Sequence, residues 1–150
     1  MSLEQIRNYF SYHDNLASAG MPTREQLADV AAAGFELVVN LAMDAAPNQL
    51  PGEAELVQEL EMAYVHIPVV WVAPHLNDLN CFFEVMKANQ GRKIFVHCVM
   101  NYRASVFIYL YRCLLEAMDE PTARQDMQKI WTPDGVWKDF IETLELRRQV

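Results

Sequence analysis

The residues best suited to chemistry lie in one short stretch, residues 93–105. An apolar run that is typical of a buried strand ends at His97 and Cys98. Four residues separate this cysteine from Arg103, and an apolar segment over residues 104–115 then predicts a helix. The N–H groups of a first helical turn have no partner within the helix, so this turn can hold an anion. The same positive field favours a thiolate at Cys98, which is the nucleophilic form of the side chain.

The loop between the cysteine and the helix is the candidate anion-binding segment: Val99, Met100, Asn101, Tyr102 and Arg103. The planar guanidinium can bind two oxygens of an anion at once, a geometry that lysine cannot supply. The loop contains no glycine, although a backbone that wraps closely around an anion often needs a residue with positive φ. Asn101 is the best substitute, because asparagine tolerates the left-handed region better than its neighbours do.

This order of strand, His-Cys, short loop, arginine and helix resembles the cysteine-dependent phosphatase superfamily, which includes the protein tyrosine and dual-specificity phosphatases. That family usually has five loop residues, whereas this chain has four. The shorter spacing looks like the rhodanese sulfurtransferases and like a bacterial phosphatase group related to the beta-lactamase hydrolase-like proteins. The flanking segments are similar to the bacterial group, at residues 19–23, 34–41, 66–68 and 131–137.

The resemblance implies a dual-specificity-phosphatase-like fold and hydrolysis of phosphomonoesters through a phosphocysteine. Cys98 would be the nucleophile and Arg103 the anion clamp. Neither a cofactor nor a metal is expected, because the loop N–H groups and the guanidinium supply the positive field. In the family, the histidine at the position of His97 hydrogen-bonds to backbone near the cysteine. Counted from Cys98, Ser105 stands where the family has a hydroxyl that stabilises the thiolate as a leaving group.

The general acid is the element that the sequence does not supply in its usual place. The resemblance implies an aspartate in the loop at residues 68–74, but this segment holds no acid. The remaining candidates are Asp44, after an expected strand, and Asp78, whose place at a helix start is also typical of a residue favoured by the helix dipole. Because loss of a general acid typically costs about 10²–10⁴-fold, we expect slow turnover that favours aryl phosphates.

Two other functions remain open from the sequence. The four-residue spacing alone would suit sulfur transfer, with Cys98 carrying a persulfide. The missing glycine and acid would suit a non-enzymatic module that binds phosphate. For the phosphatase, the expected partner is a phosphorylated small molecule or a phosphoprotein. The sequence names neither the substrate nor the oligomeric state.

The composition predicts one compact α/β domain over residues 1–150. The chain is 52% hydrophobic, which is enough for a full core. Its net charge of −8 argues against binding to nucleic acid or to an anionic membrane surface. Neither a leader over residues 1–7 nor an apolar run long enough to cross a bilayer is evident. The four histidines are scattered, without the spacing of a metal site.

The cysteines predict a reducing, cytoplasmic setting, because the three stand far apart and form no paired framework. Only Cys98 has reactive neighbours. Cys81 and Cys113 lie on expected apolar helix faces, where a packing role is the simpler interpretation.

Strand and helix patterns alternate along the chain. Strands are expected at 8–12 and 16–17 at a sheet edge, and at 35–42, 64–67 and 92–97. Helices are expected at 24–33, from Pro51 with acids on its polar face, at 77–89 with Asn77 as its cap, at 103–118, and in two further segments ending near 131 and 147. This order predicts a mostly parallel, four- to five-stranded sheet with helices on both faces, and a ligand site at the carboxyl ends of its strands.

Overall fold

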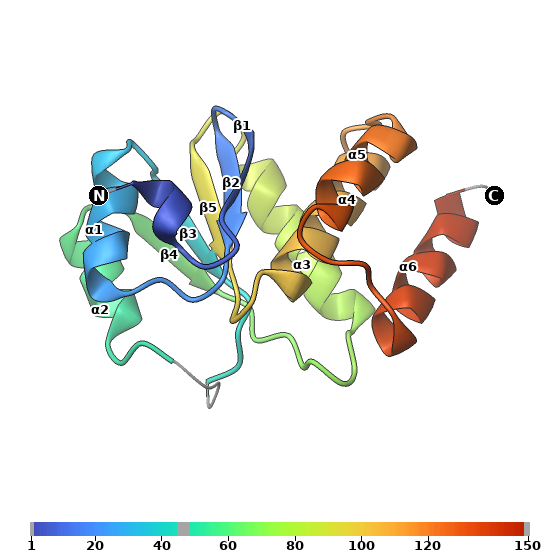
Figure 1. Cartoon of the computed structure of the whole chain (residues 1–150), viewed down its shortest axis with the longest axis horizontal. Helices are drawn as coiled ribbons and strands as arrows, with labels where there is room; N and C mark the ends of the chain where they lie inside the picture. Colours follow the sequence, from blue (N-terminus) through green and yellow to red (C-terminus); the bar gives the residue numbers. More distant parts are fainter. Residues whose placement is uncertain (1, 45–48, 149–150) are drawn as a thin grey trace.

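The computed structural model describes residues 2–44 and 49–148, and it alternates strands with helices as the sequence predicts (Figure 1). The elements in chain order are η1 (Leu3–Gln5), β1 (Phe10–His13), β2 (Leu16–Ala19), α1 (Arg24–Ala32), β3 (Leu37–Asn40), α2 (Glu53–Glu59), β4 (Ala63–His66), α3 (Leu76–Ala88), β5 (Ile94–His97), α4 (Tyr102–Leu114), α5 (Glu120–Gln128) and α6 (Gly135–Arg148).

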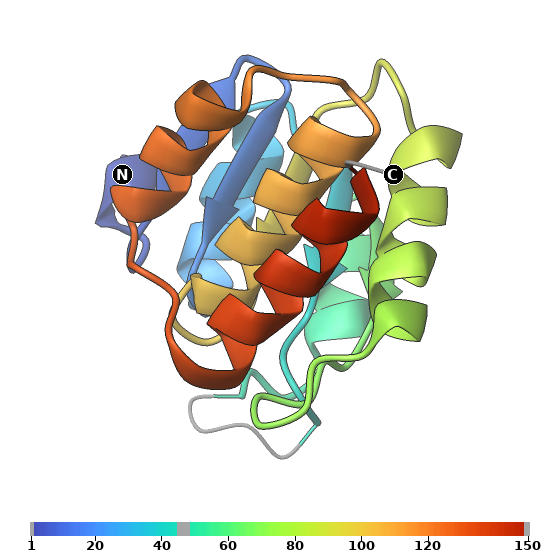
Figure 2. The same ribbon diagram turned by 90° about the vertical axis from the view of Figure 1, so that its right-hand side faces the viewer.

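The strands form one five-stranded sheet in the order β1-β2-β5-β3-β4. All neighbouring pairs are parallel except β1 and β2, which are antiparallel. Helices α1 and α2 cover one face of the sheet, while α3 to α6 cover the other (Figures 1 and 2). The predicted dual-specificity-phosphatase-like α/β fold, with a mostly parallel sheet and helices on both faces, is confirmed.

The first two strands are correctly predicted as a pair, but β2 is not at the edge of the sheet. It lies between β1 and the central strand β5. All four of its residues are buried, because small side chains such as Ala17 and Ala19 allow neighbouring layers to pack against both of its faces. Only β1 retains the edge position.

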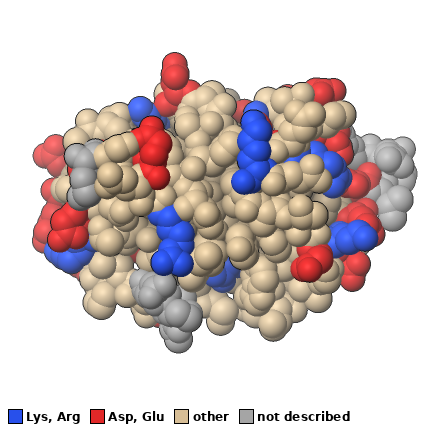
Figure 3. All heavy atoms as spheres, in the orientation of Figure 1, with Lys and Arg blue, Asp and Glu red and all other residues tan. Residues whose placement is uncertain are grey.

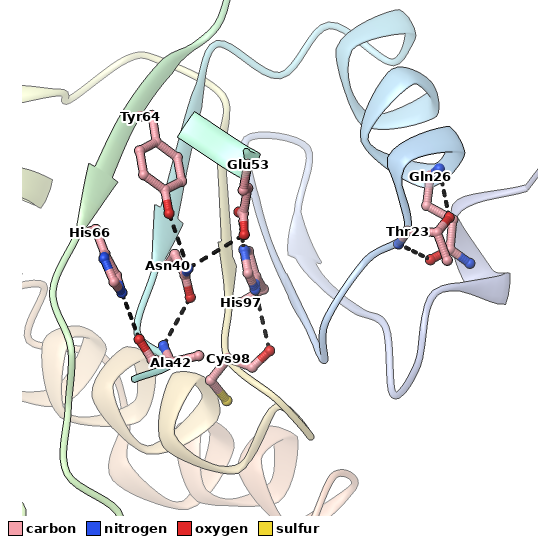
Figure 4. Close-up of polar contacts among 9 residues, drawn as sticks. All are labelled: Thr23, Gln26, Asn40, Ala42, Glu53, Tyr64, His66, His97 and Cys98. Atoms are coloured by element: carbon pink, nitrogen blue, oxygen red, sulfur yellow. Dashed lines mark hydrogen bonds and ion pairs between the residues drawn. The ribbon is translucent and has the colours of Figure 1, made fainter. Parts of the chain in front are cut away.

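The sequence predicts the start of helix α1 correctly, but it misplaces the starts of α2 and α3 by one or two residues. The capping box of α1 is confirmed, with Thr23 and Gln26 each accepting a hydrogen bond from the other's backbone N–H (Figure 4). Helix α2 begins at Glu53 and not at Pro51, because Gly52 takes a left-handed conformation with φ of 72°. Helix α3 begins at Leu76, one residue before the expected cap at Asn77; Leu76 packs against the core, and this contact extends the helix.

The core lies in two layers, one on each face of the sheet, and β5 contributes to both. Ile94 and Val96 pack on the side of α3 to α6, whereas Phe95 packs on the side of α1 and α2. Successive side chains of a strand point to opposite faces. Cys98 therefore follows Ile94 and Val96 into the first layer, and His97 points into the second. Within the part of the chain that the structure describes, no helix is both long and apolar enough to span a bilayer.

Tyrosines that are wholly or partly buried should make this fold sensitive to alkaline pH. Desolvation by burial raises the pKa of Tyr64 to about 12, and it also raises the pKa of Tyr12 and Tyr109. These phenols hold their protons more tightly in the folded chain than in the unfolded chain, where tyrosine titrates near about pH 10. Their stabilising contribution is therefore complete below about pH 10 and is lost as the pH rises toward about 12.

We accordingly expect the urea unfolding midpoint to fall as the pH rises above about 10. Tyr64→Phe, which cannot ionise, should be less stable at neutral pH because Asn40 loses its bond to the hydroxyl, but should show a shallower alkaline fall. A midpoint that stays constant up to about pH 12 would contradict this account.

Candidate active site

Cys98 lies just beyond the carboxyl end of the central strand β5 and lines a small cavity. Cys98 is only 1% exposed, and the cavity has a volume of about 210 Å³. Its lining is formed by Trp71, Cys98, Val99, Met100, Tyr102 and Arg103. The structure therefore brings the predicted nucleophile, the predicted clamp and most of the predicted loop to one place.

The loop turns into helix α4 at Asn101, which has a φ of 71°. The predicted left-handed residue is thus confirmed. The Asn101 side chain does not cap the helix. The first N–H to find a backbone partner in the helix is that of Ser105, which donates to the Asn101 carbonyl at 3.0 Å. The N–H groups of residues 102–104 are consequently available to an anion.

The loop carbonyls are each bound by groups outside the cavity. His97 Nδ1 lies 3.2 Å from the Cys98 carbonyl oxygen, and the Met21 N–H donates to the Val99 carbonyl at 3.0 Å. The amide of Asn8 donates to the Met100 carbonyl at 2.9 Å. These bonds hold the negative ends of the peptide groups away from the site, which reduces repulsion of an anion.

The N-terminal segment supports the loop in a way that the sequence did not reveal. The Asn101 amide donates to the Asn8 carbonyl at 2.7 Å, so the two asparagines bind each other's chain segments. Gly20 forms an antiparallel bridge with Met100 and donates its N–H to the Arg7 carbonyl at 2.7 Å. Asn8 itself is left-handed, with φ of 52°. Asparagine tolerates this conformation better than most residues do, so the residue type is the one sequence signal that could have pointed to a turn here.

Arg103 is nearly buried, at 7% exposure, and one terminal nitrogen donates to the Val69 carbonyl at 2.8 Å. Among the described residues this guanidinium makes no other hydrogen bond and no ion pair. The single bond fixes the orientation of the side chain while leaving most of its five N–H donors for an anion in the cavity. No carboxylate of the described chain neutralises it.

The hydroxyl of Ser105 is hydrogen-bonded to groups other than the Cys98 sulfur. It donates to the Tyr102 carbonyl at 2.9 Å and accepts from the indole N–H of Trp131 at 3.0 Å. Its proton is therefore not directed at the Cys98 sulfur in this structure. The same contacts anchor an aromatic wall, in which the Tyr102 and Trp131 rings stack at 4.6 Å between centroids and Trp71, 40% exposed, lies beside both.

The two candidate general acids do not line the cavity. The side chain of Asp44 is 84% exposed and lies 3.5 Å from His66 Nδ1 of strand β4. Asp78 is the third residue of α3, the position that the helix dipole favours. The described cavity lining contains no aspartate or glutamate at all.

Behind the loop lies a buried polar network that sequence reasoning missed (Figure 4). His97 Nε2 is 2.6 Å from Glu53 Oε2, and the Asn40 amide donates to Glu53 Oε1 at 3.4 Å and to the Tyr64 hydroxyl at 3.0 Å. Glu53 was expected on the polar face of its helix, yet it is only 6% exposed, because the first turn of α2 faces the end of β5. Figure 4 shows the Cys98 sulfur pointing away from this network.

The other two cysteines differ from each other. Cys113 is buried, as expected, but Cys81 is exposed. The buried stripe of α3 consists of Leu79, Phe82, Phe83 and Met86, and this helical spacing places Cys81 on the outward side.

The acidic charge is unevenly distributed over the face shown in Figure 3. Acidic side chains lie mainly toward the two ends of this face, over α1 and α2 on one side and over α5 and α6 on the other, while its centre is largely uncharged with a few basic groups. The net charge of −8 is therefore not concentrated on the middle of this face.

Comparison with known proteins agrees with this geometry. The sheet, helices and cysteine loop define the class of dual-specificity-like phosphatase folds. Residues 11–138 match the family model described as "DSP-PTPase phosphatase fused to NAD+ Kinase", and the chain therefore belongs to this phosphatase family. The match favours neither a sulfurtransferase nor a simple binding module. No curated protein sequence matches the chain.

Solved structures show the same fold. A protein from Shewanella putrefaciens CN-32, assigned as a DUF442 phosphatase, is 30% identical with a TM-score of 0.86, over 97% of this chain and 93% of its own. The core catalytic domain of the PP-IP phosphatase SIW14 from S. cerevisiae is 13% identical with a TM-score of 0.75, over 91% and 85%. P. aeruginosa TpbA, crystallised with pTyr, is 15% identical with a TM-score of 0.67, over 85% and 75%.

Gly20 should be required for the shape of the loop. A Cβ at this position would lie 2.5 Å from the Val99 carbonyl oxygen, which is backbone and cannot move aside freely. We expect Gly20→Ala to cost about 1–3 kcal/mol in the free energy of unfolding, measured with urea, and to weaken inorganic phosphate binding.

Gly34→Ala is the matched control. Gly34 has φ of +94° at the end of α1, and a methyl group added there would meet no atom within 4 Å, so the substitution introduces strain but no clash. It should destabilise the fold by about 1 kcal/mol without changing phosphate affinity. Equal effects of the two substitutions on phosphate affinity would show that Gly20 has no special role at the loop.

Proposed function

We propose that this protein is a cysteine phosphatase that hydrolyses phosphomonoesters through a phosphocysteine. One observation carries the proposal: Cys98 and Arg103 line the same cavity at the start of a helix, and among the described residues the arginine side chain is bound only to the Val69 carbonyl. Membership of a phosphatase family supports the same interpretation. Cys98 is the nucleophile and Arg103 the clamp for the phosphoryl group.

The reaction takes two displacements at phosphorus. The Cys98 thiolate attacks in line, so that the S–P bond forms as the P–O bond breaks, and the leaving oxygen departs with the bonding electron pair. That oxygen then takes a proton from solvent. Water next attacks the phosphocysteine, the S–P bond breaks, and inorganic phosphate is released with the thiolate restored.

The charge of the transferring group is stabilised by fixed donors of the chain itself. Tyr102 and Arg103 line the cavity, where the fork of Arg103 and the N–H groups of the first helical turn, which have no backbone partner, can reach the phosphoryl oxygens; the loop carbonyls are bound by other groups. Donors that are already in place stabilise the charge of the transition state better than mobile water does, because they do not have to reorient during the reaction.

The cavity favours an aryl leaving group. Trp71 and Tyr102 supply aromatic surface at its wall, and its described lining provides no carboxylic acid to protonate a departing oxygen. A phenolate departs without such help far more readily than an alkoxide does. The TpbA structure holds pTyr, whereas SIW14 is a PP-IP phosphatase, so the fold relatives do not choose between substrate classes.

The test is hydrolysis of para-nitrophenyl phosphate by the wild type and by Cys98→Ser. We expect turnover in the wild type and its complete loss in the variant, because a hydroxyl in this site is a far weaker nucleophile than a thiolate. Cys81→Ser, on the exposed face of α3, is the control and should keep full activity.

Two outcomes would reject the proposal. Activity retained by Cys98→Ser would exclude this thiol as the nucleophile. Formation of thiocyanate from thiosulfate and cyanide, without phosphate release from any aryl ester, would instead assign sulfur transfer to Cys98.

A second prediction concerns the leaving group. Since no acid lines the cavity, kcat/KM should be higher for phenyl phosphate than for a benzyl phosphate of similar size by about 10²–10⁴-fold. Asp44→Asn and Asp78→Asn should leave the rate on phenyl phosphate nearly unchanged. If either substitution lowers the rate on the benzyl ester by a hundredfold or more, that residue reaches the leaving group during turnover, and the prediction fails.

A further inference from the structure

The buried pair of Glu53 and His97 takes part in neither displacement at phosphorus, yet it lies directly behind the nucleophile. We propose that Glu53 is a positioning residue: acting through His97, it fixes the peptide group between Cys98 and Val99 so that its N–H is presented to the bound anion. This inference rests on the proposed function of the Cys98 site.

The hydrogen-bond donors in the pair follow from the chemistry of its partners. The Cys98 carbonyl can only accept, so His97 Nδ1, 3.2 Å away, must carry a hydrogen. The distance of 2.6 Å between His97 Nε2 and Glu53 Oε2 requires a second hydrogen between these atoms. Imidazolium with carboxylate and imidazole with carboxylic acid both satisfy this geometry, and in both the pair is neutral as a unit, as its burial favours.

Without Glu53, the His97 ring would be held only at Nδ1, so it could turn away from the Cys98 carbonyl and then take the other tautomer. A neutral imidazole carries one hydrogen, and the bond made by one ring nitrogen decides which nitrogen bears it. By binding Nε2, Glu53 keeps the hydrogen of Nδ1 directed at the Cys98 carbonyl. Asn40 in turn holds Glu53 through its other oxygen, and the Tyr64 hydroxyl holds Asn40.

The consequence for the site comes from the planarity of the peptide group. In a trans peptide the carbonyl and the following N–H point in opposite directions. A Cys98 carbonyl held by His97 therefore turns the Val99 N–H away from His97, to the side of the loop where Cys98 and Val99 line the cavity. Rotation of this peptide would replace a donor by an acceptor next to the anion.

Glu53 cannot instead be the missing general acid. It reaches the site only through His97, on the face of the sheet opposite the Cys98 sulfur, and it does not line the cavity (Figure 4). The other titratable groups near the pair are Tyr64, which Asn40 separates from Glu53, and the partly buried His66 with its exposed partner Asp44.

The experiment compares three substitutions in helix α2 of the full chain. Glu53→Leu removes the partner of His97. Glu53→Gln preserves it, because the glutamine amide can donate to Nε2 while its oxygen accepts from Asn40. Glu55→Gln, two residues along on the exposed surface, removes the same charge from the same helical turn and is the matched control.

We expect Glu53→Leu to lower kcat on para-nitrophenyl phosphate by about tenfold or more with a smaller change in KM, because it misdirects a transition-state donor without touching substrate. Glu53→Gln should restore kcat to within about threefold of wild type, and Glu55→Gln should equal wild type. The ¹⁵N chemical shifts of the His97 ring should show a protonated Nδ1 in the wild type and in Glu53→Gln.

The ring spectrum does not depend on turnover, so it separates this inference from the proposed function. If the wild type has no phosphatase activity, the proposed function fails while the spectrum still tests the pair. A bare Nδ1 in the wild type or in Glu53→Gln overturns the inference, even if Glu53→Leu does not fold. Wild-type kcat in a folded Glu53→Leu also overturns it, as does a loss in Glu53→Gln as large as that in Glu53→Leu.

Discussion

The site depends on one constraint: the peptide groups of a short turn must show their N–H ends to the cavity and keep their carbonyl ends away from it. Each planar peptide has both ends, so each carbonyl that is turned away needs a donor outside the cavity. His97, Met21 and Asn8 provide these donors for three successive peptides. The turn is therefore shaped by segments that are distant from it in the sequence.

The nucleophile and the groups that support its backbone lie on opposite faces of the sheet. Strand alternation sends Cys98 toward the layer of α3 to α6 and sends His97 toward α2. The nucleophile thus meets the cavity and its aromatic wall on one side, while its backbone is held by a buried polar network on the other. Separating the two functions lets the supporting groups stay hydrogen-bonded and dry without competing for the anion.

A four-residue loop without glycine can still make the turn, because the strain is placed on residues that tolerate it. Asn101 takes the left-handed conformation, and its amide is bound by Asn8, which is itself left-handed. Gly20 contributes by lacking a side chain, so that the neighbouring strand end can approach the Val99 carbonyl. The loop itself holds no glycine, and the glycine that its shape requires lies across from it, just after β2.

Local chemistry fixed much of what could be predicted from the chain alone. The apolar periods placed the strands and helices, the Thr23 capping box started α1, and the intolerance of most residues for positive φ singled out Asn101, since all of these depend on near neighbours in the sequence. Where two side chains meet across the fold depends on long-range packing, which carries no local signal. Only the tertiary structure could therefore bury Glu53 against His97, keep Asp44 and Asp78 out of the cavity, and bind Ser105 to Trp131.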